Sequence, residues 1–307
     1  MACQSVDPNR PWKMTKAGIV TVVGKPNAGK STLLNRLVGQ HLAITSPKPQ
    51  STRDRIVGLR TEGGVQMVIL DTPGLLEPRH QLHRSMVGAA LAALREADVI
   101  VYVVDASRDP VAPALAEVAG LGRPPEAPVL LAFNKGDLVN EVVRRELERA
   151  HPGAMVLSAR TGHGLPALLD AIAALLPESP FLYPEEDLST QHLRFFAREA
   201  VREAALEQLS EEVPHALACE IEEFRETSTP VYIRAVLHVE RDSQKRILIG
   251  SGGRRIKAIG TEARKRIETL VGGAVYLDLH VKVLPNWRRN PAALARLGYT
   301  LPPDEKK

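Results

Sequence analysis

The chain has 307 residues, of which 44% are hydrophobic and 25% are charged, a composition typical of folded globular domains. No apolar run approaches the roughly 20 residues that span a bilayer, and the first fifteen residues lack the apolar core of a signal peptide. Two cysteines, Cys3 and Cys219, are too few for a disulfide framework. These features exclude transmembrane and disulfide-stapled classes and predict a cytoplasmic protein.

The net charge is only +4, but the charges are unevenly distributed. Residues 185–226 contain 12 acidic and 4 basic residues, a local net charge of −8. Residues 241–266 contain 9 basic and 2 acidic residues, a local net charge of +7. A basic block of this kind indicates an anionic partner.

The first half of the chain alternates short apolar runs with helical patterns. Strands are expected at 17–24, 65–71, 98–105, 127–134 and 154–159, and helices at 29–39, 83–97 and 165–176. Segment 51–70 reads as two strands that turn at Gly63 and Gly64, giving one antiparallel edge. This order predicts an α/β fold with a mostly parallel sheet.

The order of elements changes after the proline-rich, acidic segment 177–187. A helix at 191–209 is followed by strands at 215–226 and 231–240, a glycine-rich turn between helical patterns, and a strand at 274–284. The second half therefore predicts a smaller α+β domain of order α-β-β-α-α-β. We expect a tail at 1–15 (with Met14 as an alternative start), domains at 16–180 and 192–300, a linker at 181–191 and a tail at 301–307.

The segment GKPNAGKS, residues 24–31, fits the pattern G-x-x-x-x-G-K-S/T between a predicted strand and a predicted helix. Its glycines let backbone N–H groups converge on phosphate oxygens at a helix N-terminus. Lys30 is expected to reach the β- and γ-phosphates, and the Ser31 hydroxyl to bind Mg²⁺. ATPases, kinases and GTPases all use such a loop.

The segment NKGD, residues 134–137, decides among these classes. It follows a predicted strand, and the Asp137 carboxylate can accept hydrogen bonds from both N1–H and N2–H of guanine. Adenine lacks the exocyclic donor and would leave that carboxylate unpaired. Segment 158–160, SAR, would close over the base with main-chain donors.

Two further segments are expected around the γ-phosphate. DTPG, residues 71–74, ends a predicted strand, so that Asp71 can hold Mg²⁺ through water and the Gly74 N–H can contact the phosphate. QSTRD, residues 50–54, lies where a first switch belongs, with Thr52 as a second Mg²⁺ ligand. Taken alone, QSTRD also fits a plain polar loop.

In this order, GKPNAGKS, Thr52, DTPG, NKGD and SAR resemble the five motifs of translation-factor-class GTPases, and PNAGKS with STRD is similar to the group that includes Era and EngA. The resemblance implies a P-loop GTPase that uses GTP, GDP and Mg²⁺. The residues it places at the nucleotide are Gly24, Lys25, Pro26, Asn27, Ala28, Gly29, Lys30, Ser31, Thr32, Asp71, Thr72, Pro73, Gly74, Asn134, Lys135, Asp137, Ser158, Ala159 and Arg160.

Hydrolysis is expected to be slow. Many small GTPases carry a water-orienting glutamine directly after DxxG, but here that position is Leu75, which cannot hydrogen-bond water. In the group that the chain resembles, an asparagine of the phosphate loop can coordinate a K⁺ ion that supplies positive charge. Asn27 matches that asparagine, so stimulation by K⁺ is expected, with Lys30, Thr52, Asn27 and Gly74 as the catalytic set.

Three interpretations compete for the segment ILIGSGGRRIKAIG, residues 247–260. A second nucleotide site is disfavoured because no G-K-S/T or base-reading motif accompanies it. A structural turn beside a solvated basic helix is the second interpretation. Basic residues at a helix N-terminus oppose the helix dipole, however, and an anion would relieve that conflict. A partner with a chain of phosphates is therefore favoured.

Gly250-Ser251-Gly252-Gly253 matches the G-x-x-G loop with which K homology (KH) domains clamp single-stranded nucleic acid. The order α-β-β-α-α-β resembles the type II KH fold. Ile249, Ile256 and Ile259 are candidates for the floor of a base-binding groove, with core packing as the alternative, favoured for Ile259. The expected RNA-binding residues are Ile249, Gly250, Ser251, Gly252, Gly253, Arg254, Arg255 and Lys257.

A GTPase domain followed by a type II KH domain resembles the Era family over nearly the whole chain, including the ending VLPNWRRNPAALARLGY. The resemblance implies binding near the 3′ end of 16S rRNA and assistance in assembly of the 30S ribosomal subunit. Residues 287–289, WRR, either extend the RNA contact or cap the domain.

Alternatives stay open at this point. One is a signalling GTPase that uses the basic block at the membrane; the block lacks a wide apolar face, so peripheral inner-membrane contact is kept only as a secondary role. Another is a KH-like domain that contacts protein only. A monomer is expected. The histidine pair His80 and His83 is expected in a solvated loop rather than at a metal, and the acidic segment 185–226 is expected to screen the basic loop in one nucleotide state.

Overall fold

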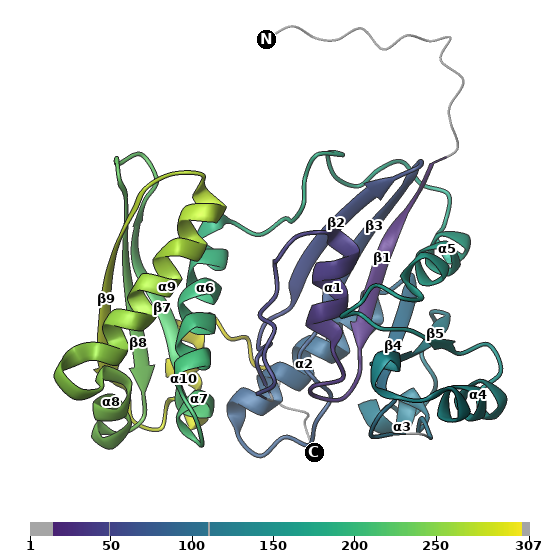
Figure 1. Cartoon of the computed structure of the whole chain (residues 1–307), viewed down its shortest axis with the longest axis horizontal. Coiled ribbons are helices and arrows are strands. Elements are labelled where there is room, and N and C mark those ends of the chain that lie inside the picture. The colour runs from purple at the N-terminus through teal and green to yellow at the C-terminus, as the bar shows by residue number, and fades with distance from the viewer. Residues whose placement is uncertain (1–14, 49, 110, 303–307) are drawn as a thin grey trace, which may run out of the picture.

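The computed structural model describes residues 15–48, 50–109 and 111–302 of the chain. The strands of these residues form a larger sheet in the N-terminal part and a smaller sheet in the C-terminal part. A long connection joins the two parts at the top of Figure 1. The alternative start Met14 lies outside the described residues.

In the described part of the chain, the larger sheet has six strands in the order β2-β3-β1-β4-β5-β6. All neighbouring pairs are parallel except β2 and β3, which pair antiparallel on either side of Gly63 and Gly64. The predicted mostly parallel sheet with one antiparallel edge is thus confirmed. The strands are β1 (Lys16–Val23), β2 (Ile56–Glu62), β3 (Val65–Asp71), β4 (Val99–Asp105), β5 (Val129–Asn134) and β6 (Met155–Val156).

Helices cover both faces of this sheet, which explains why its strands are almost entirely apolar. On one face α1 and α5 bury Leu33, Leu34 and Leu168 against the strands. On the other face α2, α3 and α4 contribute side chains such as Leu94 and Leu147. The helices are α1 (Lys30–Val38), α2 (Gln81–Glu96), α3 (Leu115–Ala119), α4 (Glu141–Ala150) and α5 (Leu165–Leu175).

The connection between the two parts runs along the edge strand β2. The Leu59 N–H donates to the Leu188 carbonyl at 2.9 Å, and the Ser189 hydroxyl donates to the Val57 carbonyl. The side chain of Gln191 accepts from the Val57 N–H at 3.1 Å. These contacts cover backbone groups that an open edge would expose, so residues 188–191 of the connection also protect the sheet.

The smaller sheet has the order β7-β8-β9, with β7 and β8 antiparallel and β8 and β9 parallel. One face of this sheet is covered by helices α6, α8 and α9, which bury Val201, Leu248 and Ile259 against it. The elements are α6 (Leu193–Gln208), α7 (Val213–Ala216), β7 (Ala218–Arg225), β8 (Val231–Val239), α8 (Asp242–Ile249), α9 (Arg254–Val271) and β9 (Val275–Val283). The predicted α-β-β-α-α-β order is present, with the short α7 added.

The C-terminal segment joins the two parts. Trp287 is fully buried, and its Nε1–H donates to the Ala216 carbonyl at 2.8 Å. It shares a hydrophobic cluster with Leu82 and Met86 of α2 and with residues of α10 (Pro291–Arg296). Leu301, which was expected in a tail, packs against the same cluster. Trp287 was expected either to extend the RNA contact or to cap the domain, and its buried position agrees with capping. None of the described helices is both long and apolar enough to cross a membrane.

Candidate functional site

The motif residues meet at one edge of the larger sheet. Asp71 ends β3, Asp105 ends β4 and Asn134 ends β5, while Gly24 follows β1 directly. Because β1, β3, β4 and β5 are parallel, their carboxyl ends lie side by side. In open α/β sheets this edge is where ligands bind.

The phosphate loop, residues 24–31, connects β1 to α1. Gly29 adopts φ 93°, and a Cβ there would lie 2.2 Å from Asn134 Nδ2, so only glycine fits. Lys30 is buried, and its ammonium donates to the carbonyls of Gly24 at 3.1 Å and Lys25 at 2.9 Å. Burial lowers the pKa of Lys30 to about 8, and the nearby Asp71 carboxylate opposes that shift. The lysine thus curls around the loop, with its charge held where phosphates would lie.

Three oxygen-bearing side chains converge beside the loop. The Ser31 hydroxyl donates to Asp71 Oδ2 at 2.7 Å and lies 2.8 Å from the Thr52 hydroxyl, which is 3.3 Å from the same carboxylate oxygen. Burial raises the pKa of Asp71, and among the described residues its other oxygen, Oδ1, is buried without a hydrogen-bond partner. Hard oxygen ligands with an unsatisfied buried carboxylate fit Mg²⁺.

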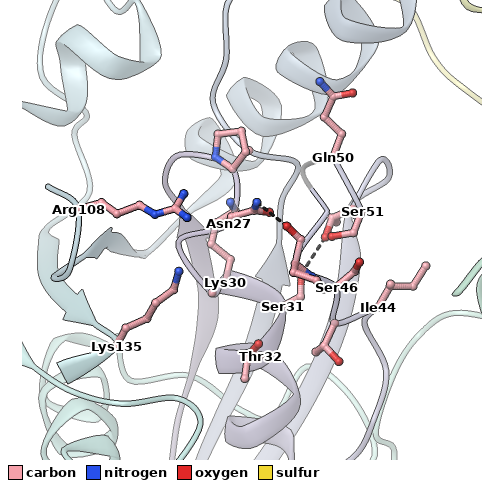
Figure 2. A pocket seen from close by; sticks show the side chains of 16 residues that line it. Asn27, Lys30, Ser31, Thr32, Ile44, Ser46, Gln50, Ser51, Arg108 and Lys135 are labelled. Carbon is pink, nitrogen blue, oxygen red and sulfur yellow. Dashed lines mark hydrogen bonds between the residues drawn. The ribbon is translucent and has the colours of Figure 1, made fainter. Parts of the chain in front are cut away.

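A cavity of about 380 Å³ opens over these residues (Figure 2). Asn27 and Lys30 line it from the phosphate loop, Thr32 lines it from α1, and Thr52 and Gly74 line it from the segments that follow. Asn27 adopts φ 63°, and its amide nitrogen donates to the Pro47 carbonyl at 2.8 Å. That bond fixes the side chain against the segment between α1 and β2.

NKGD and SAR form one hydrogen-bonded unit with the phosphate loop. The Asn134 side chain donates to the Ala28 carbonyl at 2.8 Å and accepts from the Ala159 N–H at 2.9 Å. The Asp137 carboxylate accepts from the Ser158 hydroxyl and from Arg160, at 2.5 Å each. The hydrogen bond from Ser158, together with Arg160, lowers the pKa of Asp137, so the acceptor needed for guanine is ionised at neutral pH.

Some residues at the site were not anticipated from the motifs. Arg108 is one of them and lines the cavity, whereas Lys135, which was expected from NKGD, lines it too and donates to Asp105 at 2.5 Å. Arg36 of α1 donates to the carbonyls of Ala159 and Arg160 and so holds the SAR segment. The other lining residues that were missed are Ile44, Thr45, Ser46, Pro47, Gln50 and Ser51. Gln50 and Ser51 lie in QSTRD, but no sequence signal marked the others.

The segment between α1 and β2 also contacts the C-terminal part; we call its described residues 45–48 and 50–54 the switch segment. Arg53 is buried beside Thr52, and its guanidinium donates to the carbonyls of Leu217, Pro214 (3.1 Å) and His215 (3.3 Å). The same guanidinium lies 5.6 Å from the centre of the Trp287 ring. Thr52 at the nucleotide cavity and Arg53 in the C-terminal part are therefore neighbours along the chain.

Helix α6 holds the rest of the switch segment. Arg198 pairs with Asp54 at 2.5 Å, and Arg202 donates to the Ser51 carbonyl. Glu203 accepts from the Thr45 N–H at 3.2 Å and also pairs with His41 and Arg266. Part of the acidic segment 185–226 is therefore engaged by the switch segment and by α9.

The G-x-x-G loop lies between α8 and α9. Gly252 and Gly253 have φ 58° and 76°, and α9 begins without a side-chain cap or an acidic residue in its first turn. Free N–H groups at a helix N-terminus favour an anion. Arg254 and Lys257 are exposed there, whereas Arg255 donates to the Ile247 carbonyl of its own domain.

The three isoleucines near this loop differ in exposure. Ile249 and Ile256 are partly exposed, but Ile259 is fully buried in the core beneath α9, as the alternative of core packing expected. Arg254 and Lys257 line a hollow of about 530 Å³ together with Glu207 of α6. Glu207 is thus the acidic residue of segment 185–226 that lines this hollow.

Comparison with known proteins identifies both parts. Residues 19–135 match the family model described as a 50S ribosome-binding GTPase, and residues 212–288 match that of the KH domain. GTPase Era of Pseudomonas fluorescens Pf-5 is 42% identical over 295 residues, covering 93% of this chain and 97% of that protein. GTPase Era of Pseudomonas putida W619 is 43% identical with the same coverage.

The chain belongs to the GTPase Era family. Two solved structures of Era are similar over 94% of this chain and 100% of theirs, both at 38% identity. One is Era with MgGDPNP and nucleotides 1506–1542 of 16S ribosomal RNA, with a TM-score of 0.87. The other is a single-residue variant of Aquifex aeolicus Era bound to GDP·AlF4⁻, with a TM-score of 0.86. The two parts are accordingly called the G domain and the KH domain below.

Membership of the Era family makes the chain a GTP-hydrolysing enzyme that uses GTP, GDP and Mg²⁺. Mg²⁺ neutralises phosphate charge when bound, and Ser31, Thr52 and Asp71 would hold it. The Lys30 ammonium would add a fixed positive charge on the phosphates, and electrostatic stabilisation of this kind is the larger part of catalysis in phosphoryl transfer. Leu75 is buried and its N–H donates to the Gly24 carbonyl at 3.0 Å, so its side chain orients no water.

Proposed function

We propose that this protein is a GTP-driven switch that binds single-stranded RNA near the 3′ end of 16S rRNA and assists assembly of the 30S subunit. The observation that carries the proposal is the G-x-x-G loop of the KH domain, which leads into α9, whose first turn exposes Arg254 and Lys257. The related Era structure that contains nucleotides 1506–1542 of 16S ribosomal RNA supports the choice of RNA.

Within this proposal, each domain has its own task. The G domain, residues 16–180, holds the nucleotide through the motif residues predicted above, with Asn27, Lys30, Thr52 and Gly74 at the reacting phosphate. The linker 181–191 leads to the KH domain, residues 192–300, which holds the RNA backbone with residues 249–255 and 257. The protein acts in the cytoplasm, where its RNA partner is assembled; peripheral contact with the membrane stays a secondary prediction.

The nucleotide state reaches the KH domain through the switch segment. Thr52 belongs to the Mg²⁺ site, and Arg53 next to it is fixed to α7 and Trp287. A movement of Thr52 on loss of the γ-phosphate would therefore act directly on the KH domain. This route replaces simple screening of the basic loop as the main link, with Glu207 in a supporting role.

The test is RNA binding by a loop variant. Gly252→Asp with Gly253→Asp places two negative charges where phosphates are expected, at positions with open space or only distant contacts around a Cβ. Binding of a labelled RNA of nucleotides 1506–1542 is measured by fluorescence anisotropy with a GTP analogue bound. Affinity is expected to fall about tenfold or more, equivalent to about 1.4 kcal/mol.

The matched control lies at the other end of the same helix. Gly272 also has positive φ, and a Cβ at Gly272 or Gly273 meets nothing within 4 Å. Gly272→Asp with Gly273→Asp adds the same charge and is expected to leave RNA affinity within about twofold. Undiminished RNA binding by the loop variant would exclude the loop and favour a KH domain that contacts protein.

A further inference from the structure

The histidines His80 and His83 do not lie in a solvated loop. His80 caps the N-terminus of α2, where its ring nitrogen Nδ1 accepts from the His83 N–H at 3.4 Å, and His83 is 6% exposed. Their ring centres are 3.8 Å apart. Both rings line a cavity of about 500 Å³ between the G domain and the KH domain, and His215 of α7 lines it from the KH domain.

Arginines surround these rings. Arg79 precedes α2, Arg241 precedes α8, and Arg288 lies in the C-terminal segment; all three line the cavity. Arg288 pairs with Glu240 at 2.5 Å, but neither Arg79 nor Arg241 forms an ion pair with any described carboxylate. The remaining carboxylate of the lining, Glu212, is exposed to solvent.

The excess of positive charge around the cavity affects the pKa values of the histidines. Burial, the neighbouring His83 and Arg288 lower the pKa of His80 to about 4. Burial and the same Arg288 lower the pKa of His83 and of His215, with Arg53 adding to both effects. The rings are therefore neutral at neutral pH, and each keeps one N–H donor.

Hydrogen bonds determine which ring nitrogen carries the proton in His80 and in His83. Nδ1 of His80 accepts from the His83 N–H, and Nδ1 of His83 accepts from the Arg79 N–H at 3.3 Å. The N–H donor of each ring is consequently Nε2. No group of three or more acidic, histidine or cysteine residues among the described part of the chain could hold a metal ion. Neutral N–H donors beside unpaired guanidinium groups suit an oxyanion instead.

We propose that this interdomain cavity is a phosphate-binding site, separate from the nucleotide site and from the G-x-x-G loop. Arg79, His80 and His83 hold the phosphate from the G domain, and Arg241, Arg288 and His215 hold it from the KH domain. An occupied site bridges the segment that follows DTPG to the start of α8. Because both domains supply donors, the bound phosphate stabilises this arrangement of the two domains.

Two sources of phosphate fit the chemistry: a small phosphorylated molecule, or a phosphodiester of bound RNA. Helix α8 has eight residues and spans about 12 Å, so the cavity and the G-x-x-G loop lie at opposite ends of one short helix. An RNA strand held in the loop can reach the cavity over that distance. The experiment below separates the sources.

The test observes the histidine rings directly. Protein labelled with ¹³C-histidine is saturated with GDP and Mg²⁺ to occupy the nucleotide site, and ring resonances are assigned with His80→Gln, His83→Gln and His215→Gln. Inorganic phosphate is titrated at pH 7.5 against sodium chloride of equal ionic strength. We expect saturable shifts of the three rings with phosphate, with a dissociation constant of about 1 mM or lower, and none with chloride.

Variants show whether the site is specific. Arg79→Gln with Arg241→Gln is expected to raise the dissociation constant about tenfold or more. Arg149 is an exposed arginine of α4 outside the cavity. Arg149→Gln removes one positive charge and is expected to leave the dissociation constant for phosphate unchanged. Shifts that do not saturate, that chloride reproduces, or that survive the double substitution would overturn the proposal.

A second arm identifies the source. Single-stranded RNA of nucleotides 1506–1542 is added in place of phosphate. Shifts of the same rings that inorganic phosphate competes away assign the site to an RNA phosphodiester. Saturation by inorganic phosphate without any response to RNA assigns it to a small molecule. Loss of RNA binding at the G-x-x-G loop would not alter the phosphate titration, so the two proposals fail independently.

Discussion

At the scale of single residues, the nucleotide site depends on side chains whose polar atoms are held in place before any ligand arrives. Asp137 is the clearest case, since Ser158 and Arg160 already fix its carboxylate and keep it ionised. An ionised acceptor in a fixed position discriminates between bases because the wrong base leaves it unpaired.

Asp137→Asn is therefore expected to change base preference. The amide offers a donor where guanine also has a donor, whereas xanthine has a carbonyl oxygen there. Affinity for GTP should fall about a hundredfold, equivalent to about 2.7 kcal/mol, and affinity for XTP should rise. Equilibrium dialysis with both nucleotides measures this. Arg160→Gln removes the same ion pair without changing the acceptor, so a shift in preference with that control would contradict the assignment.

Asn27 carries the expected K⁺ effect. GTP turnover by the native protein should be faster in K⁺ than in Na⁺, on the order of tenfold or about 1.4 kcal/mol in the barrier, and Asn27→Ala should be slow in both salts. Alanine also removes the hydrogen bond to the Pro47 carbonyl. Asn27→Asp loses that donor but keeps an oxygen, so it should keep the preference for K⁺. Equal native rates in the two salts would rule the effect out.

At the scale of elements, the switch segment is the least independent part of the G domain. It lacks helix or strand structure of its own and is held by α6, α7 and the C-terminal segment. Arg53 provides the central contact, because a buried guanidinium satisfies three carbonyls at the end of α7. Its position beside Thr52 makes α7 a support of the Mg²⁺ site.

Arg53→Met should therefore reduce both stability and turnover. The substitution keeps an apolar stem but leaves three carbonyls without their donor, at a cost of about 3 kcal/mol in the free energy of unfolding. The rate of GTP hydrolysis should fall because Thr52 loses its anchor. Denaturant unfolding and single-turnover kinetics measure the two effects.

Arg55→Met is the matched control for that prediction. Arg55 lies two residues further along and pairs with Glu96 on the surface, with 40% of its side chain exposed. Exposed pairs contribute little, so stability should change by less than about 1 kcal/mol and turnover should be unaffected. Normal turnover by Arg53→Met, or an equal loss in both variants, would contradict the role given to α7.

At the scale of the whole molecule, the two domains share a polar interface as well as the cluster around Trp287. His41 of the G domain contacts Glu203 of α6 at 3.0 Å, with Arg266 and Glu207 nearby. The hydrogen bond to Glu203 raises the pKa of His41 above its ordinary value of 6.5, while burial and Arg266 oppose that shift.

This interface should weaken as pH rises. A histidine with a raised folded-state pKa stabilises the fold fully below its unfolded pKa and loses that contribution as pH rises through the folded pKa. The difference in melting temperature between native protein and His41→Gln should thus be larger at about pH 5.5 than at about pH 8.5. In a Glu203→Gln background the pH dependence of that difference should disappear. A difference that grows with pH would contradict the assignment.

The nucleotide motifs were predictable because each is a short local pattern in a fixed context. Strand, glycine-rich turn and helix follow one another in GKPNAGKS, and the parallel sheet brings DTPG and NKGD to the same edge. The G-x-x-G loop and the order of the KH domain were predictable for the same reason. The break in pattern at 177–187 was visible in the sequence, but the contacts of Leu188 and Ser189 with β2 were not.

The sequence by itself therefore determined the family, the two kinds of domain and the motif segments that the larger sheet brings together at one edge, since local spacing encodes those features. Only the tertiary structure decided that Arg53 joins the switch segment to α7, which lies far along the chain, and that His80 and His83 meet His215 in one cavity. Such contacts depend on how two folded domains pack, because side chains that are distant in sequence follow no common period.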